Sequence, residues 1–311
     1  MREWLNRTHV GDCRELLKEM AADGVRVQTC VTSPPYFGLR DYGVEGQMGL
    51  EPTPTEYVEQ MVAVFRAVRE VLADDGTVWL NLGDSYWTAK GASCGVDDKQ
   101  PARRGWARPQ DRPAPAGLKG KDLIGIPWRV AFALQADGWY LRSDIIWHKP
   151  NPIPESVTDR PTKAHEYLFL LAKSERYYYD ADSIKEAATD TGRLNGIHGR
   201  DERAEARPPG SSARTLARID YSSRGRNKRT VWTIPTAPFS GAHFATFPRA
   251  LIEPCILAGS RPCDVVLDPF MGSGTTAQVA TDLGRNFVGC ELNPKYVELH
   301  EMRRTTVGMP L

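Results

Sequence analysis

The stretch VVLDPFMGSGTTA, residues 265–277, decides the fold class of this 311-residue chain. Its β-branched start predicts a buried strand, and its glycines predict a turn that opens a helix. Gly272, Gly274 and Ala277 fit the GxGxxG/A spacing, in which the backbone approaches a ligand closely. Glu291 follows 19 residues after Gly272, at the end of the next predicted strand. The arrangement predicts a nucleotide-binding half-sheet, against the alternative of a tight turn that only needs glycine.

Two features of this stretch favour S-adenosylmethionine (SAM) over a dinucleotide as the ligand. Asp268 lies at the mouth of the predicted turn, where its charge would repel a pyrophosphate but could pair with the ammonium group of a methionine moiety. Only 20 residues follow Glu291, too few to complete a dehydrogenase sheet. The other strands are therefore expected from the N-terminal part of the chain, in a circularly permuted order.

Segments of strand and helix character alternate along the rest of the chain. Val25–Thr32 is an apolar, β-branched run, and apolar residues recur at helical spacing over Thr55–Leu72. Thr55 is the expected N-cap of that helix, and Asp74-Asp75-Gly76 its expected end. Such alternation predicts an α/β fold with a mostly parallel sheet that helices cover on both faces.

A second unusual stretch, Thr32-Ser33-Pro34-Pro35-Tyr36, directly follows a predicted strand. Its two prolines stiffen the backbone and remove two N–H donors. The turn is rich in acceptors, because the Ser33 hydroxyl and the carbonyls of Ser33 and Pro34 stand beside an aromatic ring. It suits an exocyclic amino group, whose two N–H bonds need acceptors, while Tyr36 stacks on the base that carries this group.

The charge of the chain is unevenly distributed, although the formal net charge is only +1. Residues 99–121 contain seven Lys or Arg and one acid, and residues 185–229 contain eleven Lys or Arg and six acids. The rest of the chain carries 22 basic and 32 acidic residues. An acidic body with two basic segments predicts a polyanionic partner held by loops, against the alternative of two solvated loops.

Composition and spacing exclude several classes of protein. With 41% hydrophobic and 25% charged residues the chain is an ordinary globular protein, and no apolar run approaches the ~18–20 residues of a membrane span. The six cysteines form no CxxC pair, and His148, His165 and His243 show no ligand spacing. We therefore expect an intracellular protein with reduced thiols and neither a metal site nor a disulfide framework.

With both motifs in place, the chain resembles the amino-methylating DNA methyltransferases that modify N4 of cytosine or N6 of adenine. The resemblance is to the group whose catalytic motif precedes the SAM motif, and it covers nearly the whole chain outside the basic segments. Thr32–Tyr36 resembles the catalytic (D/N/S)PP(Y/F) motif, and Leu267–Thr276 the glycine-rich SAM motif. His243–Pro248 resembles the segment that closes over the methionine end of SAM. Ile146–Pro152 and His165–Tyr167 resemble segments near the flipped base.

The resemblance implies a Rossmann-like SAM-dependent methyltransferase fold with a mostly parallel seven-stranded sheet and a circularly permuted motif order. It implies catalytic roles for Ser33, Pro34, Pro35 and Tyr36, with no metal. Asp12 is expected at the adenine amino group of SAM and Glu291 at its ribose. The residues implied in SAM binding are Asp12, Thr246, Phe247, Pro248, Asp268, Phe270, Gly272, Ser273, Gly274, Thr275 and Glu291.

The resemblance also divides the chain into three parts. Residues 1–181 are expected to form the catalytic half with a basic loop at about 88–121, residues 182–230 a basic target-recognition insert, and residues 231–311 the SAM-binding half. The expected partner is double-stranded DNA with a flipped base, and arginines of the insert could contact guanine. A homodimer, a cognate restriction endonuclease and a cytoplasmic location in a prokaryote or from a phage gene are further expectations.

Several alternatives are open at this point. Ser33 favours N4 of cytosine over N6 of adenine, because family members that act on adenine more often carry aspartate or asparagine there. An RNA methyltransferase or a non-catalytic DNA-binding subunit could keep the same motifs, whereas Asp268 argues against a nicotinamide oxidoreductase. Cytosine-C5 methylation needs a nucleophilic cysteine, but Pro254-Cys255 lies in an apolar helical pattern typical of a core. Asp84, after a predicted strand, is either a functional acid or a turn cap.

Overall fold

A single sheet organises the computed structural model, which describes residues 3–88, 109–187, 225–236 and 247–298. The described residues form eight strands in the order β1-β8-β7-β2-β3-β5-β4-β6. Strand β5 is antiparallel to both of its neighbours, β3 and β4, and the other paired strands are parallel. The strands are β1 (Arg7–Val10), β2 (Val27–Thr32), β3 (Leu72–Leu82), β4 (Tyr140–His148), β5 (His165–Ala172), β6 (Val231–Thr233), β7 (Val265–Asp268) and β8 (Asn286–Glu291).

The mostly parallel α/β sheet is confirmed, but the described sheet has one strand more than the seven expected. The additional strand is β6, which has three residues and pairs in parallel with the end of β4. Its Trp232 is buried, with its ring centroid 6.4 Å from that of Trp79. Burial of this indole holds the strand at the sheet edge. Three residues are too few for a periodic pattern, so the sequence did not predict this strand.

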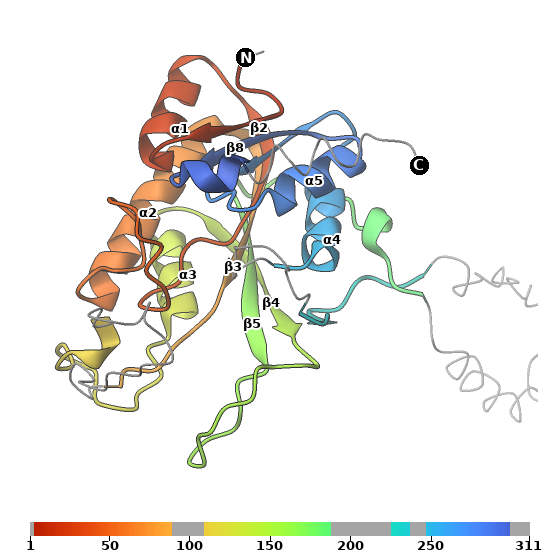
Figure 1. The fold of residues 1–311 in the computed structure, drawn as a ribbon. Coiled ribbons are helices and arrows are strands. Elements are labelled where there is room, and N and C mark those ends of the chain that lie inside the picture. The colour runs from red at the N-terminus through yellow and green to blue at the C-terminus, as the bar shows by residue number, and fades with distance from the viewer. Residues whose placement is uncertain (1–2, 89–108, 188–224, 237–246, 299–311) are drawn as a thin grey trace, which may run out of the picture.

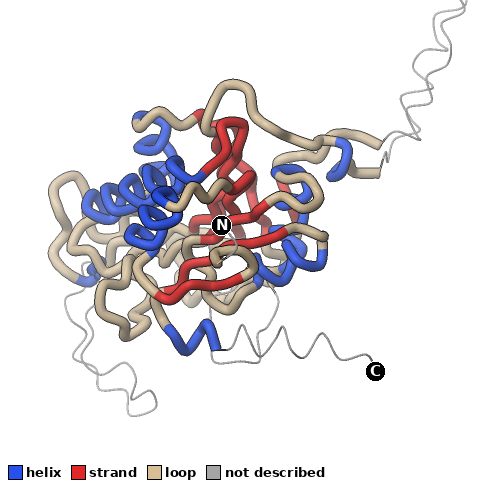
Figure 2. Tube along the Cα trace, turned by 90° about the horizontal axis from the view of Figure 1, so that it is seen from above, coloured by secondary structure: helices blue, strands red, loops and turns tan. Residues whose placement is uncertain are grey.

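Helices cover both faces of the sheet (Figure 1). One face carries α1 (Cys13–Ala22), α2 (Pro54–Val71) and α3 (Ile126–Ala136), and the other carries α4 (Arg249–Gly259) and α5 (Thr275–Asp282). Figure 2, which looks from above, shows the strands between these two layers of helices. Within the described residues, no helix is both long and apolar enough to cross a membrane.

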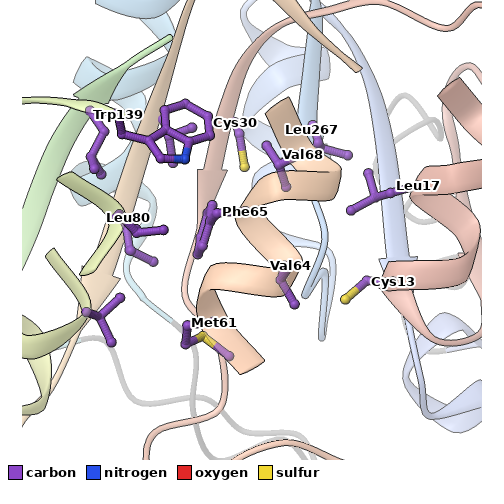
Figure 3. Packing of buried hydrophobic residues seen from close by; sticks show 14 of the residues in the cluster. Cys13, Leu17, Cys30, Met61, Val64, Phe65, Val68, Leu80, Trp139 and Leu267 are labelled. Atoms are coloured by element: carbon purple, nitrogen blue, oxygen red, sulfur yellow. The ribbon is translucent and has the colours of Figure 1, made fainter. Parts of the chain in front are cut away.

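Helix α2 lies at the centre of the larger apolar core (Figure 3). Met61, Phe65 and Val68 recur every three or four residues on one face of the helix, and all three are fully buried. This face belongs to the same core cluster as Cys30 of β2 and Leu17 of α1. Burial of each such large side chain contributes roughly 1.5–3 kcal/mol to stability, so the packing of α2 fixes β2 and the turn that follows it.

Both ends of α2 differ from the sequence prediction. Its N-cap is Thr53 rather than Thr55, because Thr53 Oγ1 accepts a hydrogen bond from the N–H of Glu56 at 3.2 Å. Pro54 then occupies the first turn, where its missing N–H leaves no bond unmade. At the other end, Asp74-Asp75-Gly76 lies inside β3 instead of a turn. An irregularity in the β2–β3 register accommodates these extra residues.

Strands from both ends of the described chain build this one sheet. Strand β1 pairs in parallel with β8, and the side chains of Asn6 and Asn286 share a hydrogen bond of 2.9 Å. Strand β2 pairs with β7 in the same way. The expected halves, residues 1–181 and 231–311, therefore contribute neighbouring strands. The permuted motif order itself stays a prediction.

Candidate active site

Two turns meet at the carboxyl ends of neighbouring parallel strands. Strands β2 and β7 are parallel neighbours, with Cys30 opposite Leu267, so the chain leaves both strands on the same side of the sheet, at their carboxyl ends. The turn after β2 contains Ser33 and Pro35, and the turn after β7 is the glycine loop 269–274. One pocket is lined by residues of both turns and has about 930 Å³ of space between protein atoms and at its open mouth.

The glycine loop has a backbone conformation that other residues rarely adopt. Gly272 and Gly274 have φ angles of 54° and 82°, in the left-handed region where a Cβ would strain the chain. Gly274 is the N-cap of α5, and Thr275, the first residue of that helix, lines the pocket. The N–H of Met271 donates to the Cys290 carbonyl at 2.9 Å, which fastens the loop to β8.

Asp268 lies buried beside the loop and is not among the residues that line the pocket. Its Oδ1 accepts hydrogen bonds from Thr32 Oγ1 at 2.6 Å and from the N–H of Phe270 at 3.0 Å. Its Oδ2 accepts one from Thr276 Oγ1 at 2.6 Å. Burial raises the pKa of Asp268 to about 6, although these donors favour the charged form. The carboxyl group thus joins β2, the loop and α5, and its expected pairing with a ligand's ammonium group stays a prediction.

Two other acids line the pocket. The carboxylate of Glu291 accepts hydrogen bonds from the N–H groups of Gly272 and Asn293, both at 2.8 Å, while burial raises its pKa. Asp12 caps α1 and forms an ion pair with Arg14 at 2.5 Å. Its hydrogen bonds with the Arg14 side chain lower the pKa of Asp12. Carboxylate oxygens have several lone pairs each, so both acids can also accept hydrogen bonds from a ligand.

The Ser-Pro-Pro-Tyr turn is held from several sides. The hydroxyl of Tyr57 on α2 donates to the Pro35 carbonyl at 2.9 Å. Gly83, directly after β3, lies so close to the ring of Tyr36 that a Cβ there would be 2.5 Å from Cε2. Glycine is therefore required at position 83 by close approach. These contacts fix the turn that places Ser33 in the pocket wall.

A polar cluster surrounds the hydroxyl of Tyr36. Tyr36 Oη is 2.7 Å from Glu166 Oε2 and 2.9 Å from Asn81 Oδ1. Glu166 forms an ion pair with Lys149, whose Nζ lies 4.3 Å from the ring centroid of Trp147. Burial, together with the charge of Glu166, raises the pKa of Tyr36 well above its ordinary value. The Tyr36 hydroxyl is therefore a proton donor at neutral pH.

The structure brings most of the predicted site residues to this one pocket. Those that line it are Asp12, Ser33, Pro35, Phe247, Phe270, Gly272, Ser273, Thr275 and Glu291. Pro34, Tyr36, Pro248 and Gly274, like Asp268, are described but do not line it. Thr246 lies outside the described residues.

One wall of the pocket consists of residues that no sequence motif indicated. Residues of the loop between β2 and α2 form it, together with residues that follow Glu291. They are Tyr42, Val44, Gly46, Gln47, Met48, Leu292, Asn293 and Tyr296. The loop has no periodic pattern and no motif. Its position after the carboxyl end of a parallel strand, where ligands bind in α/β sheets, was the signal that could have found it.

Asp84 and Cys255, for which the sequence allowed two roles each, have structural roles. Asp84 Oδ1 accepts hydrogen bonds from the N–H groups of Gly125 and Ile126 at 3.0 and 3.1 Å, so Asp84 caps the start of α3. Cys255 is fully buried, its Sγ donates to the Leu251 carbonyl, and burial raises its pKa well above the ordinary value. Its thiol is a core group, as expected, and not the accessible nucleophile that C5 methylation needs.

The structure describes residues 109–121 of the first basic segment and residues 182–187 and 225–230 of the insert, and the rest of both lies outside the described residues. Glu186 and Arg226 form an antiparallel bridge with two backbone hydrogen bonds of 2.9 Å. The Glu186 carboxylate also pairs with Arg226 and Arg229. This bridge brings the two ends of the insert together, and the DNA contacts expected of the insert stay a prediction.

Known proteins are similar in sequence to nearly the whole chain. Residues 27–302 match the family model for N6- and N4-specific methyltransferases, described as DNA methylase. The chain is 49% identical over 289 residues to the type II methyltransferase M.Cfr9I of Citrobacter freundii, covering 93% of this chain and 84% of the relative. It is 50% identical over 294 residues to M.SmaI of Serratia marcescens, covering 94% and 89%.

Solved structures share the fold at lower sequence identity. The PvuII DNA methyltransferase (cytosine-N4-specific) gives a TM-score of 0.60 at 20% identity, covering 96% of this chain and 88% of that one. The M1.HpyAVI–SAM complex gives 0.52 at 18% identity, covering 96% and 98%. These similarities support the Rossmann-like α/β architecture.

Proposed function

The chain belongs to the DNA methylase family of N6- and N4-specific methyltransferases, and we propose that it is a type II enzyme that methylates N4 of a cytosine at a specific site in duplex DNA. Its methyl donor is SAM, the cofactor of this family. A homodimer and a cognate restriction endonuclease stay expectations of the family resemblance.

One observation carries the proposal. A single pocket is lined by Ser33 and Pro35 of the acceptor-rich turn and by Gly272 and Glu291 of the nucleotide-binding motif. An exocyclic amine held at Ser33 is therefore held beside a bound nucleoside cofactor. A non-catalytic DNA-binding protein has no need of this juxtaposition, whereas methyl transfer between the two molecules requires it.

The pocket lining suits SAM. Asp12 and Glu291 offer carboxylate acceptors for an adenine amino group and for ribose hydroxyls. Phe270 and Leu292 offer apolar surface to a heterocycle, and the backbone at Gly272 lets the loop approach the ligand closely. When bound, SAM supplies a methyl group already activated on a sulfonium, so no nucleophilic side chain is needed.

The residues of the turn would then activate and aim the amine. An exocyclic amine is a weak nucleophile because its lone pair is delocalised into the ring, and flipping the base out of the duplex costs a few kcal/mol. Ser33 Oγ and the Pro34 carbonyl accept the two N–H bonds, which localises the lone pair and points it toward the cofactor side of the pocket. Tyr36 stacks on the base. Positioning supplies most of the acceleration.

Nucleoside mass spectrometry tests this function. Unmethylated genomic DNA is incubated with SAM and protein and digested to nucleosides. We expect N4-methylcytosine with the wild type and with the control Ser174→Ala. Ser174 lies near the amino ends of the parallel strands, away from the pocket, where its hydroxyl donates to the Asp74 carbonyl. With Ser33→Ala the yield should fall by about 100-fold or more, the order found when a positioned catalytic hydrogen bond is lost.

Other products would contradict parts of the proposal. N6-methyladenine would overturn the choice of cytosine and the interpretation of Ser33 but keep the fold and the chemistry. Methylation of RNA and not of duplex DNA would overturn the substrate. SAM binding without any methylated product would overturn the enzymatic role.

A further inference from the structure

The contacts around Tyr36 determine the direction of its hydrogen bonds. Tyr36 Oη has three oxygen neighbours: Glu166 Oε2 at 2.7 Å, Asn81 Oδ1 at 2.9 Å and Ser33 Oγ at 3.3 Å. A carboxylate and an amide oxygen can only accept. Tyr36 has one proton, which therefore goes to Glu166 or Asn81. The contact with Ser33 can then form a hydrogen bond only if Ser33 is the donor.

Two further contacts fix the acceptors in these roles. Asn81 Nδ2 donates to the Tyr167 carbonyl at 3.0 Å, which turns the amide oxygen toward Tyr36. Lys149 pairs with the other oxygen of Glu166, and the two side chains are 18% and 15% exposed. The Glu166 carboxylate therefore accepts a hydrogen bond on each oxygen, from the Lys149 ammonium group on one and from the Tyr36 hydroxyl on the other.

We propose that Lys149, Glu166 and Tyr36 form a relay that makes Ser33 an acceptor only, by committing its hydroxyl proton to Tyr36. The inference rests on the proposed function and deepens it. Ser33 lines the pocket and Tyr36 does not, so the proton is directed away from the pocket and the Oγ lone pairs are left for the target amine. A serine free to rotate could point its proton at the amine and repel it.

The length of the Ser33–Tyr36 contact agrees with a site that is completed by its substrate. The Ser33–Tyr36 distance of 3.3 Å exceeds the ~2.5–3.0 Å usual for hydroxyl pairs. Catalytic hydrogen bonds are often long without substrate and shorten in the reacting complex. In this relay the Tyr36 hydroxyl and the side chains of Glu166 and Lys149 position Ser33, which touches the amine, while the ring of Tyr36, kept in Tyr36→Phe, is the part assigned to stacking on the base.

A double-mutant cycle tests the relay. Tyr36→Phe removes the hydroxyl but keeps the ring, and single-turnover rates are measured with excess enzyme so that slow variants remain measurable. We expect Tyr36→Phe to slow methyl transfer about 10- to 100-fold, in line with the loss of one hydrogen bond to a charged network, with the Kd for SAM unchanged. Tyr177→Phe, which removes a hydroxyl bonded to Arg142 at the opposite edge, should keep the wild-type rate.

The decisive comparison uses Ser33→Ala as the background. If the Tyr36 hydroxyl acts through Ser33, the double variant Ser33→Ala/Tyr36→Phe is as slow as Ser33→Ala alone. The same slowing by Tyr36→Phe in both backgrounds would overturn the relay, because the hydroxyl would then act on the base directly. The wild type in the same assay decides the proposed function separately: additive variants of an active enzyme contradict only the relay.

A second comparison separates the relay from a merely structural role of the ion pair. Lys149→Met leaves the Glu166 carboxylate without the ammonium group that pairs with it, whereas Lys149→Arg keeps a cation there. We expect Lys149→Met to slow methyl transfer in the wild-type background but not in the Ser33→Ala background, with the Kd for SAM unchanged, and Lys149→Arg to keep most of the wild-type rate. Equal slowing by Lys149→Met in both backgrounds would overturn the part assigned to Lys149.

Discussion

Asp268 couples the two turns of the candidate active site through its side chain. It binds the hydroxyl of Thr32, the residue before Ser33, and the hydroxyl of Thr276 in α5. It also accepts the N–H of Phe270 within the glycine loop. This carboxyl group therefore adds to the pairing of β2 with β7 in holding the acceptor-rich turn beside the glycine loop.

The raised pKa of Asp268 predicts a pH-dependent stability. Folding raises this pKa from 3.8 to about 6, so the folded chain binds the proton more tightly than the unfolded chain. The stabilising contribution is complete below about pH 4 and is lost as pH rises through 6. A pKa difference of about two corresponds to about 3 kcal/mol. In denaturant unfolding experiments, the unfolding free energy should therefore fall more steeply between pH 4 and 7 in the wild type than in Asp268→Asn.

The difference between the two proteins isolates Asp268 from other acids. Burial also raises the pKa of Glu291 and of Glu51, and both acids are present in wild type and variant alike. A difference in unfolding free energy that is constant between pH 4 and 7 would contradict the assignment of this titration to Asp268.

Site residues that belong to a short sequence motif could be predicted from the sequence. Ser33, Gly272 and Glu291 were predicted because each follows a strand in a short, recognisable pattern, and all three line the pocket. The surroundings of Asp268 could not be predicted in this way. Its partner Thr32 is 236 residues away in sequence, and only the pairing of β2 with β7 brings the two together. The same holds for Tyr36 and Glu166.

At the scale of elements, α3 depends on a cap from another segment. Asp84 accepts the N–H groups that begin α3, and its Oδ1 also accepts the N–H of Ser85 at 2.9 Å. We expect Asp84→Ala to lower the unfolding free energy by about 1–2 kcal/mol. Asp84→Asn, whose amide oxygen can still accept, should stay near the wild type in the same chemical denaturation experiment. Equal losses in both variants would indicate that the charge, and not the cap, matters.

Elements with a long apolar pattern were predicted well, and short or irregular ones were not. The helical spacing over residues 55–72 predicted the position of α2 (Pro54–Val71), although its N-cap and its end differ from the residues expected. Strand β6 has only three residues, and the pocket wall formed by the loop around Tyr42 has no repeating pattern. Their positions follow from tertiary contacts, such as the burial of Trp232 beside Trp79, which a local pattern does not contain.

On the scale of the whole molecule, the excess of basic residues lies in segments outside the strands and helices that form the sheet and its covering layers. The chain outside the two basic segments carries an excess of acids, whereas residues 185–229 carry eleven Lys or Arg against six acids. The structure shows that two of these arginines, Arg226 and Arg229, are paired with Glu186 at the base of the insert. The arginines available for phosphate are therefore expected in the middle of the insert and not at its ends.

This distribution predicts how DNA affinity responds to salt. Replacing Arg203, Arg207, Arg214 and Arg218 by serine should weaken DNA binding and flatten the plot of log affinity against log salt. The magnitude of the slope should fall by about 0.9 for each phosphate that the variant no longer neutralises. Affinities are measured by fluorescence anisotropy between about 50 and 300 mM salt, a range of the order in which counterion release dominates binding. The matched control replaces Arg66, Arg142, Arg176 and Arg261, which lie toward the opposite sheet edge, and should keep the slope. Equal slopes in wild type and insert variant would mean that these arginines of the insert do not neutralise phosphates of the DNA backbone.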